Sequence, residues 1–151
     1  MTTLSLCWVD DALANPCCRA STVCYHHPRL IKLKVGQQEI KIGRRNSANT
    51  LHYHIESNLH RLIISRDHAT TTRLPDGRFM LHDYSLTGTY VNCTRVYGCA
   101  ILNQEDIICF GHPYGTSVLP GQTVNAFYSD LKYRVRIAFC YVTGTSTAAV
   151  V

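Results

Sequence analysis

Long apolar runs are absent from this 151-residue chain. No stretch approaches the roughly 18 consecutive apolar residues that a membrane-spanning helix requires. The first nine residues lack the basic start and the apolar stretch of a secretory signal peptide. We therefore expect no membrane partner and no secretion.

Charge is also scarce, since 17% of the residues are charged and 46% are hydrophobic, which indicates a folded domain rather than a disordered chain. Lys and Arg number 15 against 10 Asp and Glu, but they form no long basic run. The net charge of +5 suits an anionic partner. It does not predict direct nucleic-acid binding, because no strand face combines aromatic with basic residues.

Helical periodicity is missing as well, and short runs that alternate polar with apolar residues take its place. Turn signals such as Pro75-Asp76-Gly77 separate these runs. The predicted strands are residues 29–35, 39–42, 51–55, 62–64, 69–74, 78–84, 89–92, 100–102, 107–110 and 132–141. The predicted fold class is all-β, a two-sheet antiparallel β-sandwich with little helix.

We expect a single domain at residues 29–141, with a long loop at 112–130 that is rich in Gly, Pro, Ser and Thr. Residues 1–28 are predicted to be an N-terminal arm that can include a first strand. Residues 142–151 are predicted to be a flexible tail.

Eight cysteines raise the question of a disulfide scaffold. Cys109 and Cys140, however, stand inside apolar strand-like runs, where free cysteine packs as a small hydrophobic residue. This placement favours a reducing compartment, the cytoplasm or the nucleus.

An N-terminal group of cysteines and histidines raises the separate question of a zinc site. Structural zinc sites usually have two separated pairs with short spacing, and this group does not. We therefore predict no metal and no cofactor; the group comprises Cys17, Cys18, Cys24, His26 and His27.

Three polar motifs follow one another at predicted strand ends and loops, where a β scaffold displays binding residues. They are Gly43-Arg44, then Ser65-Arg66-Asp67-His68-Ala69, then residues 83–92 (DYSLTGTYVN). This series resembles the forkhead-associated (FHA) family, whose pattern is Gly-Arg, Ser-x-x-His and an Asn-Gly-Thr loop ending in Val-Asn-Gly. Residues 106–111 (DIICFG) resemble a further strand of that family. The resemblance spans roughly residues 29–141 and implies an FHA/SMAD-like sandwich with its binding loops at one end.

The resemblance implies that Arg44 and Ser65 bind a phosphate. A guanidinium offers planar, charge-assisted, bidentate hydrogen bonds, and a serine hydroxyl donates one more. Standing alone, Arg44 would be an ordinary surface arginine and Ser65 a turn serine. The order of the motifs favours the binding roles.

Four further residues are implied to support the site. His68 is expected to be a buried scaffold histidine rather than a ligand or catalyst. Gly43 precedes the phosphate-binding arginine, and Gly88 supplies backbone freedom in the recognition loop. Asn92 is expected to tie that loop to its neighbours through its amide.

The chain departs from the family pattern at Leu86 and Thr87, where the family has Ser or Thr followed by Asn. Both are expected to shape the peptide groove. Thr87 should replace only part of the asparagine's hold on the peptide backbone, which weakens affinity by roughly tenfold or more. Arg66 and Arg45 are candidates for added charge that favours doubly phosphorylated or acidic peptides.

Two smaller departures concern geometry. The segment between Gly43 and Ser65 is several residues longer than the family pattern, which predicts a bulge or an outward loop. Cys93 replaces the final glycine of Val-Asn-Gly. We expect no enzyme, because Ser65 and His68 lack a third group and no nucleophile elbow occurs.

The sequence is therefore interpreted as a phosphothreonine-dependent protein-interaction module that recognises a phosphorylated partner segment. The resemblance favours nuclear signalling over a cytoplasmic role. The alternative is an FHA-like scaffold with lost or weakened phosphopeptide binding that acts as a dimerisation or assembly domain, so a homodimer stays open.

Overall fold

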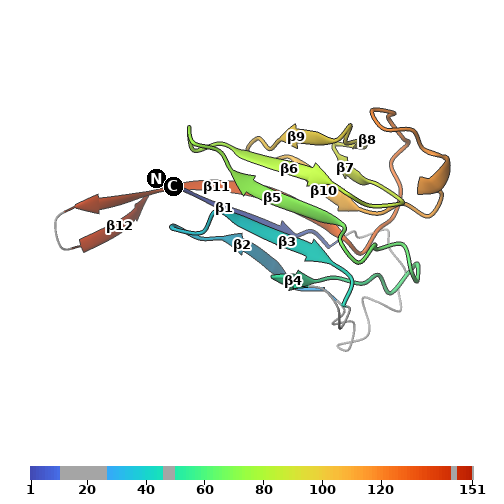
Figure 1. Cartoon of the computed structure of the whole chain (residues 1–151), viewed down its shortest axis with the longest axis horizontal. Coiled ribbons are helices and arrows are strands. Elements are labelled where there is room, and N and C mark those ends of the chain that lie inside the picture. Colours follow the sequence, from blue (N-terminus) through green and yellow to red (C-terminus); the bar gives the residue numbers. More distant parts are fainter. Residues whose placement is uncertain (11–26, 46–49, 144–145, 151) are drawn as a thin grey trace.

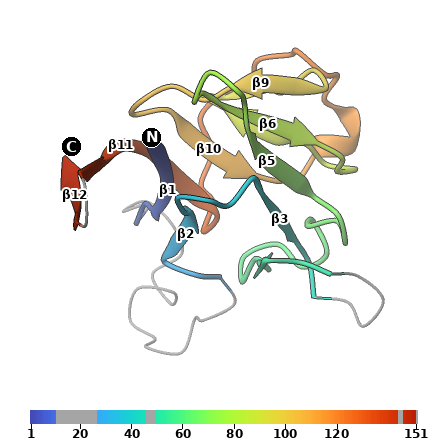
Figure 2. The same cartoon turned by 60° about the vertical axis from the view of Figure 1, so that its left-hand side comes forward.

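Two β-sheets pack face to face in the computed structural model, which describes residues 1–10, 27–45, 50–143 and 146–150 (Figures 1 and 2). The first sheet has the order β2-β1-β11-β10-β7-β8, with β12 paired to β11, and the second has the order β4-β3-β5-β6-β9. The strands are β1 Thr2–Trp8, β2 Leu30–Leu33, β3 Glu39–Gly43, β4 Tyr53–His54, β5 Ala69–Arg73, β6 Phe79–Asp83, β7 Thr89–Val91, β8 Thr94–Arg95, β9 Cys99–Ile101, β10 Ile107–Phe110, β11 Lys132–Thr143 and β12 Ser146–Val150.

The prediction of an all-β sandwich with little helix is confirmed. Within the described residues the only helical element is the 3₁₀ turn η1, Gly115–Ser117. All strand pairs run antiparallel except the short pair of β3 with β4. No helix in this part of the chain has the length and apolar character needed to cross a bilayer.

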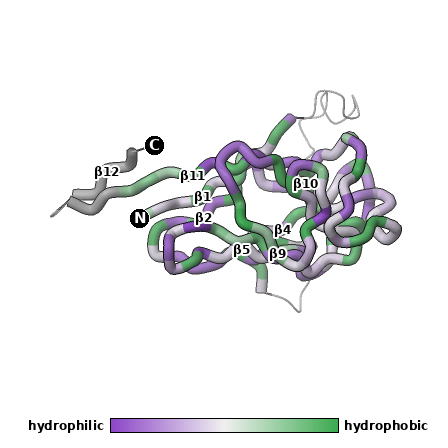
Figure 3. The backbone as a smooth tube through the Cα atoms, turned by 90° about the horizontal axis from the view of Figure 1, so that it is seen from above, coloured by the Kyte–Doolittle hydropathy of each residue, from purple (hydrophilic) through white to green (hydrophobic). Residues whose placement is uncertain are grey.

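Alternating side chains explain why these segments pair as strands. In β1, Leu4 and Leu6 are buried, and in β3, Ile40 and Ile42 are buried, while their sequence neighbours are more accessible. Side chains on a strand point alternately to opposite faces, so each sheet turns one apolar face inward. Figure 3 shows the resulting alternation of green and purple along the sandwich. The core between the sheets is completed by residues such as Phe110.

Two segments differ from the sequence-based expectation. Residues 62–64 do not form a strand, and Leu62 is exposed with a φ of 64°. The first strand that the N-terminal arm was expected to include is Thr2–Trp8, which lies between β2 and β11. Residues 142–150 were expected as a flexible tail, whereas 142–143 extend β11 and Ser146–Val150 pairs with it along the hairpin that projects in Figure 1.

The loops that carry the three polar motifs gather at the end of the sandwich opposite the β11–β12 hairpin (Figure 1). They are the β3–β4, β4–β5 and β6–β7 connections, joined there by the long connection between β10 and β11. The sheets therefore provide a rigid support for loops that are far apart in sequence.

Candidate functional site

The loop after β3 and the loop before β5 are in direct contact. The Arg44 amide donates a hydrogen bond of 3.0 Å to the Ser65 carbonyl oxygen. A Cβ atom added to Gly43 would lie 2.0 Å from the Arg66 carbonyl oxygen, so only glycine permits this approach. The backbone thus brings the Gly-Arg motif beside the Ser-x-x-His motif, as the sequence predicted.

The guanidinium of Arg44 has no neutralising partner among the described residues. The side chain is half-buried, and its Nε is buried without a hydrogen-bond acceptor. No ion pair in the described part of the chain involves Arg44. Buried donors are normally paired, so the Arg44 guanidinium can donate hydrogen bonds to an anionic acceptor.

Ser65 connects this pair of loops to the β6–β7 loop, residues 84–88. Its Oγ accepts a hydrogen bond of 2.9 Å from the Leu86 amide. As an acceptor in that bond, the hydroxyl keeps its own hydrogen, and no donation from it is found within the described residues. The two contacting loops therefore carry one neutral donor, the Ser65 hydroxyl, and one cationic donor, the Arg44 guanidinium.

His68 locks the Ser65 loop to the 84–88 loop. Its Nδ1 accepts from the Ser65 amide at 3.1 Å, and its Nε2 donates to the Gly88 carbonyl at 2.9 Å. The residue is fully buried, and burial lowers the pKa of His68 from its usual 6.5 to about 4. Both ring nitrogens are engaged by backbone groups, so this neutral histidine braces the site and is not positioned to deprotonate Ser65.

The 84–88 loop is also held by a network around Asp83. The Asp83 carboxylate accepts from the Ser85 hydroxyl at 2.6 Å and from the Thr89 hydroxyl at 3.0 Å. The Ser85 Oγ in turn accepts from the Gly88 amide at 2.8 Å. Gly88 has a φ of 103°, and a Cβ there would collide with the Tyr90 ring, so glycine is required.

Leu86 and Thr87 occupy opposite sides of this loop. Leu86 is 71% exposed and faces solvent. Thr87 is 8% exposed, and its hydroxyl donates to the Ile63 carbonyl oxygen at 2.6 Å. In this conformation the Thr87 hydroxyl is used inside the protein, so its expected contact with the peptide backbone stays a prediction. Leu86 and Tyr84, which is 63% exposed, are the two large apolar side chains that this loop presents to solvent.

Arg95 is a supporting residue that the motifs did not reveal. It is buried, and its guanidinium donates to the carbonyl oxygens of Gly115 at 2.8 Å, Val118 at 2.6 Å and Leu86 at 3.3 Å. A Cβ on Gly115 would lie 2.0 Å from the Thr87 oxygen, so the β10–β11 connection packs directly behind the 84–88 loop. No local signal marks Arg95, because its partners come from other loops.

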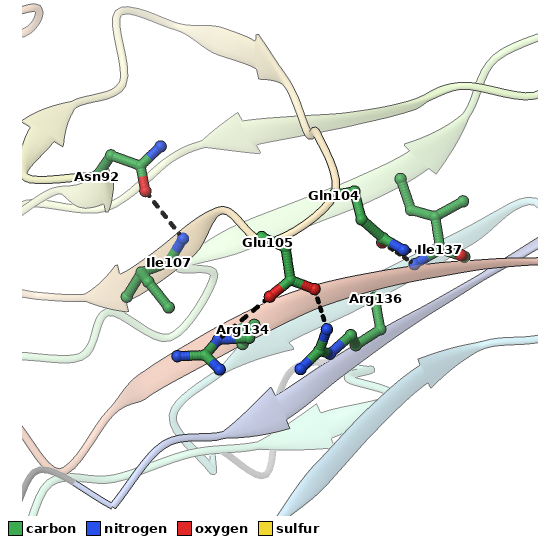
Figure 4. Close-up of polar contacts among 7 residues, drawn as sticks. All are labelled: Asn92, Gln104, Glu105, Ile107, Arg134, Arg136 and Ile137. Atoms are coloured by element: carbon green, nitrogen blue, oxygen red, sulfur yellow. Dashed lines mark hydrogen bonds and ion pairs between the residues drawn. The ribbon is translucent and has the colours of Figure 1, made fainter. Parts of the chain in front are cut away.

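Asn92 ties a loop to its neighbours through its side-chain amide, and this loop is the turn after β7, at the opposite end of that strand from the 84–88 loop. Its Nδ2 donates to the Asp106 carboxylate at 2.9 Å. Its Oδ1 accepts from the Ile107 backbone amide at 3.0 Å, as Figure 4 shows. Asn92 and Cys93 have φ values of 50° and 68°, the geometry of a two-residue type I′ hairpin between β7 and β8. Asn92 therefore anchors a hairpin remote from the binding loops. Near this hairpin, Figure 4 also shows the ion pair between Glu105 and Arg134.

The remaining candidates are cationic or remote. Arg45 and Arg66 are exposed on the same two loops as Arg44 and Ser65.

His27 is the one member of the N-terminal Cys/His group within the described residues, and the others lie outside them. No cluster of three metal-binding side chains occurs in the described residues. The cysteines of this part are free thiols, and burial raises the pKa of Cys109 to about 12.

Comparison with known proteins agrees with this architecture. The model of the FHA domain family matches residues 40–111. The solved structure "Engineered FHA with Myc-pTBD peptide" is 18% identical, with a TM-score of 0.54 and coverage of 89% of each chain. The structure "Structural and functional analysis of phosphothreonine-dependent FHA domain interactions" is 20% identical, with a TM-score of 0.49 and coverage of 89% of this chain and 94% of that one. No curated protein sequence matches the chain.

Proposed function

Residues 40–111 belong to the FHA domain family, and from that premise we propose that the chain binds a phosphothreonine in a partner protein through Arg44 and Ser65. The proposed role is a phosphorylation-dependent protein-interaction module. Signalling in the nucleus is the setting we propose for it.

The contact between two loops supports this proposal most directly. The 3.0 Å bond from the Arg44 amide to the Ser65 carbonyl joins two loops. One loop carries a guanidinium without a carboxylate partner among the described residues, and the other carries a serine hydroxyl that is free to donate. A phosphate dianion needs several donors and positive charge, and these two groups supply both. The exposed Leu86 side chain next to Ser65 gives an apolar contact for the residues that flank the phosphate.

Fluorescence polarisation with a phosphothreonine peptide library and its unphosphorylated twin tests the proposal. We expect the phosphorylated library alone to bind, with phosphothreonine preferred to phosphoserine. Arg44→Ala should weaken binding by about 10- to 100-fold, because hydrogen bonds to charged groups contribute about 1.5–3 kcal/mol. Arg44→Lys keeps the positive charge but loses the two parallel N–H donors of the guanidinium, so its affinity should lie between those of Arg44→Ala and the wild type.

Arg78→Ala is the matched control. Arg78 is an exposed arginine paired with Asp76 at 2.7 Å in the turn before β6, away from the binding loops. This variant should bind as the wild type does. Equal binding of the phosphorylated and unphosphorylated libraries would overturn the proposal.

The inward orientation of Thr87 favours a second candidate function, a scaffold that has lost phosphopeptide binding and acts in assembly. Sedimentation or light scattering across a concentration series distinguishes the two. The scaffold function requires a dimer or larger assembly together with no gain in affinity from phosphorylation. The interaction module requires that gain whatever the oligomeric state.

A further inference from the structure

A cavity beside Arg44 is not explained by binding of a single phosphate. It measures about 420 Å³ and lies between the loop after β3 and the loop before β5. This volume is within the range of about 300–1,000 Å³ that is typical of ligand pockets. The cavity is large enough for a whole additional side chain of a bound peptide. Its lining includes Arg44, Arg45, Glu56, Asn58 and Arg61.

The charge of this lining is strongly unbalanced. The lining includes three arginines and a single acidic residue, Glu56, which leaves a formal excess of two positive charges. Arg45 and Arg61 are both exposed. Within the described residues, no ion pair joins any of these arginines to an acidic group. Like charges gathered without a counter-charge favour an anionic occupant.

The hydrogen-bonding groups of the cavity residues point to the same chemistry. The Nε of Arg44 and the Nδ2 of Asn58 are buried donors without an acceptor. Buried donors are rarely left unpaired, because an unpaired one loses the hydrogen bond that it would make with water. A ligand that brings acceptor oxygens can satisfy both donors once these side chains turn toward it. A carboxylate or a phosphate provides such oxygens.

The loop that carries Arg61 is held in place rather than left free. The buried Asp130 carboxylate accepts from the Ser57 hydroxyl at 2.7 Å and from the backbone amide of Asn58 at 2.6 Å. The Ser57 Oγ then accepts from the amides of Leu59 and His60 at 3.1 and 3.0 Å. The additional residues between the first two motifs therefore form a fixed wall of the cavity.

We propose that this cavity, the Arg61 pocket, is a second anion-binding subsite, and that the preferred ligand carries a second acidic group near its phosphothreonine. The proposal rests on the phosphothreonine binding proposed above and extends it. The second group is a phosphorylated residue or an aspartate or glutamate, since both present charged acceptor oxygens to the same donors. Arg44 borders both subsites, whereas Arg61 belongs to the second alone.

A positional scan tests this subsite. Each peptide carries one phosphothreonine and, at a single flanking position, phosphoserine, aspartate or the uncharged serine and asparagine. For the wild type we expect a gain of about tenfold at one or two adjacent positions for phosphoserine, and a smaller gain for aspartate. A gain for phosphoserine alone restricts the second group to a phosphate.

Arg61→Ala should remove this gain and leave affinity for the singly phosphorylated peptide unchanged. Arg61→Glu should favour a lysine at the same position, and Arg78→Glu is the matched control with wild-type preferences. A flat scan for the wild type, or a gain that survives in Arg61→Ala, would refute the subsite. So would an equal loss by Arg61→Ala for singly and doubly anionic peptides.

The failure of the two proposals is distinguishable. If the singly phosphorylated peptide binds and the scan is flat, the second subsite alone fails. If the wild type does not distinguish the singly phosphorylated peptide from its unphosphorylated twin, phosphothreonine binding fails and the subsite fails with it. Thermal melting of each variant separates a loss of binding from a loss of folding.

Discussion

Acidification should destabilise this domain through His68, which stays neutral in the folded protein. The ring is fully buried against the Phe110 ring, with centroids 6.0 Å apart, and it bridges the Ser65 amide and the Gly88 carbonyl. Burial disfavours the charged imidazolium and is the main cause that lowers the pKa of His68 to about 4, against 6.5 for an exposed histidine. A protonated imidazole would also be unable to accept from the Ser65 amide.

The direction and size of the effect follow from these two pKa values. Between pH 6.5 and pH 4 the unfolded chain binds a proton at His68 and the folded protein does not, so stability falls as the pH is lowered through this window. Above pH 6.5 the residue is neutral in both states and has no effect. A depression of about 2.5 pKa units corresponds to roughly 3 kcal/mol, nearly all of it lost by pH 4.

Urea unfolding at a series of pH values measures this loss. His68→Gln can still donate to Gly88 but does not titrate, so its stability should vary less between pH 7 and pH 4 than that of the wild type, by roughly 3 kcal/mol. His54→Gln, at an exposed position, should follow the wild-type profile. Parallel profiles for wild type and His68→Gln, or an NMR titration of the His68 ring near pH 6.5, would refute the reasoning.

Three other substitutions test the framework around the site. Gly43→Ala places a Cβ against the Arg66 carbonyl oxygen. We expect the free energy of unfolding in urea to fall by roughly 1–3 kcal/mol and phosphopeptide binding to weaken. An unchanged urea midpoint would contradict the close contact of the two loops. Arg95→Leu removes the guanidinium that donates to three carbonyl oxygens, so we expect a loss of about 3 kcal/mol. A loss below about 1 kcal/mol would show that water replaces the guanidinium. Cys93→Gly removes a side chain from a left-handed turn position and should raise the free energy of unfolding by on the order of 1 kcal/mol in the same assay. A decrease would show that the packing of the Cys93 side chain outweighs the backbone strain.

Much of the sandwich was predictable because its strands follow a simple physical rule. Segments such as 39–42 and 107–110 have apolar residues at the positions that one face of a strand must bury. The short strand β8 was missed because two residues carry no periodic pattern. The 62–64 run was misread because Leu62 is apolar yet stands at a left-handed turn position on the surface.

The site was predictable only as far as its motifs reach. Gly43, Arg44, Ser65 and His68 were found because the order of short motifs implied a common loop surface, and the structure brings them together. The orientation of Thr87 and the bracing by Arg95 depend on contacts with the loops at residues 63 and 115–118. Such contacts between distant segments leave no trace in local spacing.

The geometry of the 84–88 loop changes how specificity can arise in this domain. The Thr87 hydroxyl is used internally and the Leu86 amide is bonded to Ser65, so neither is left to bond a peptide backbone. The proposed recognition therefore depends on the charge around Arg44, on the Ser65 hydroxyl and on apolar contact with Leu86. Charge acts over several ångströms and tolerates many neighbouring residues, whereas backbone hydrogen bonds impose an exact register. We therefore expect the proposed binding to depend more on how many anionic groups a segment carries than on which residues surround them.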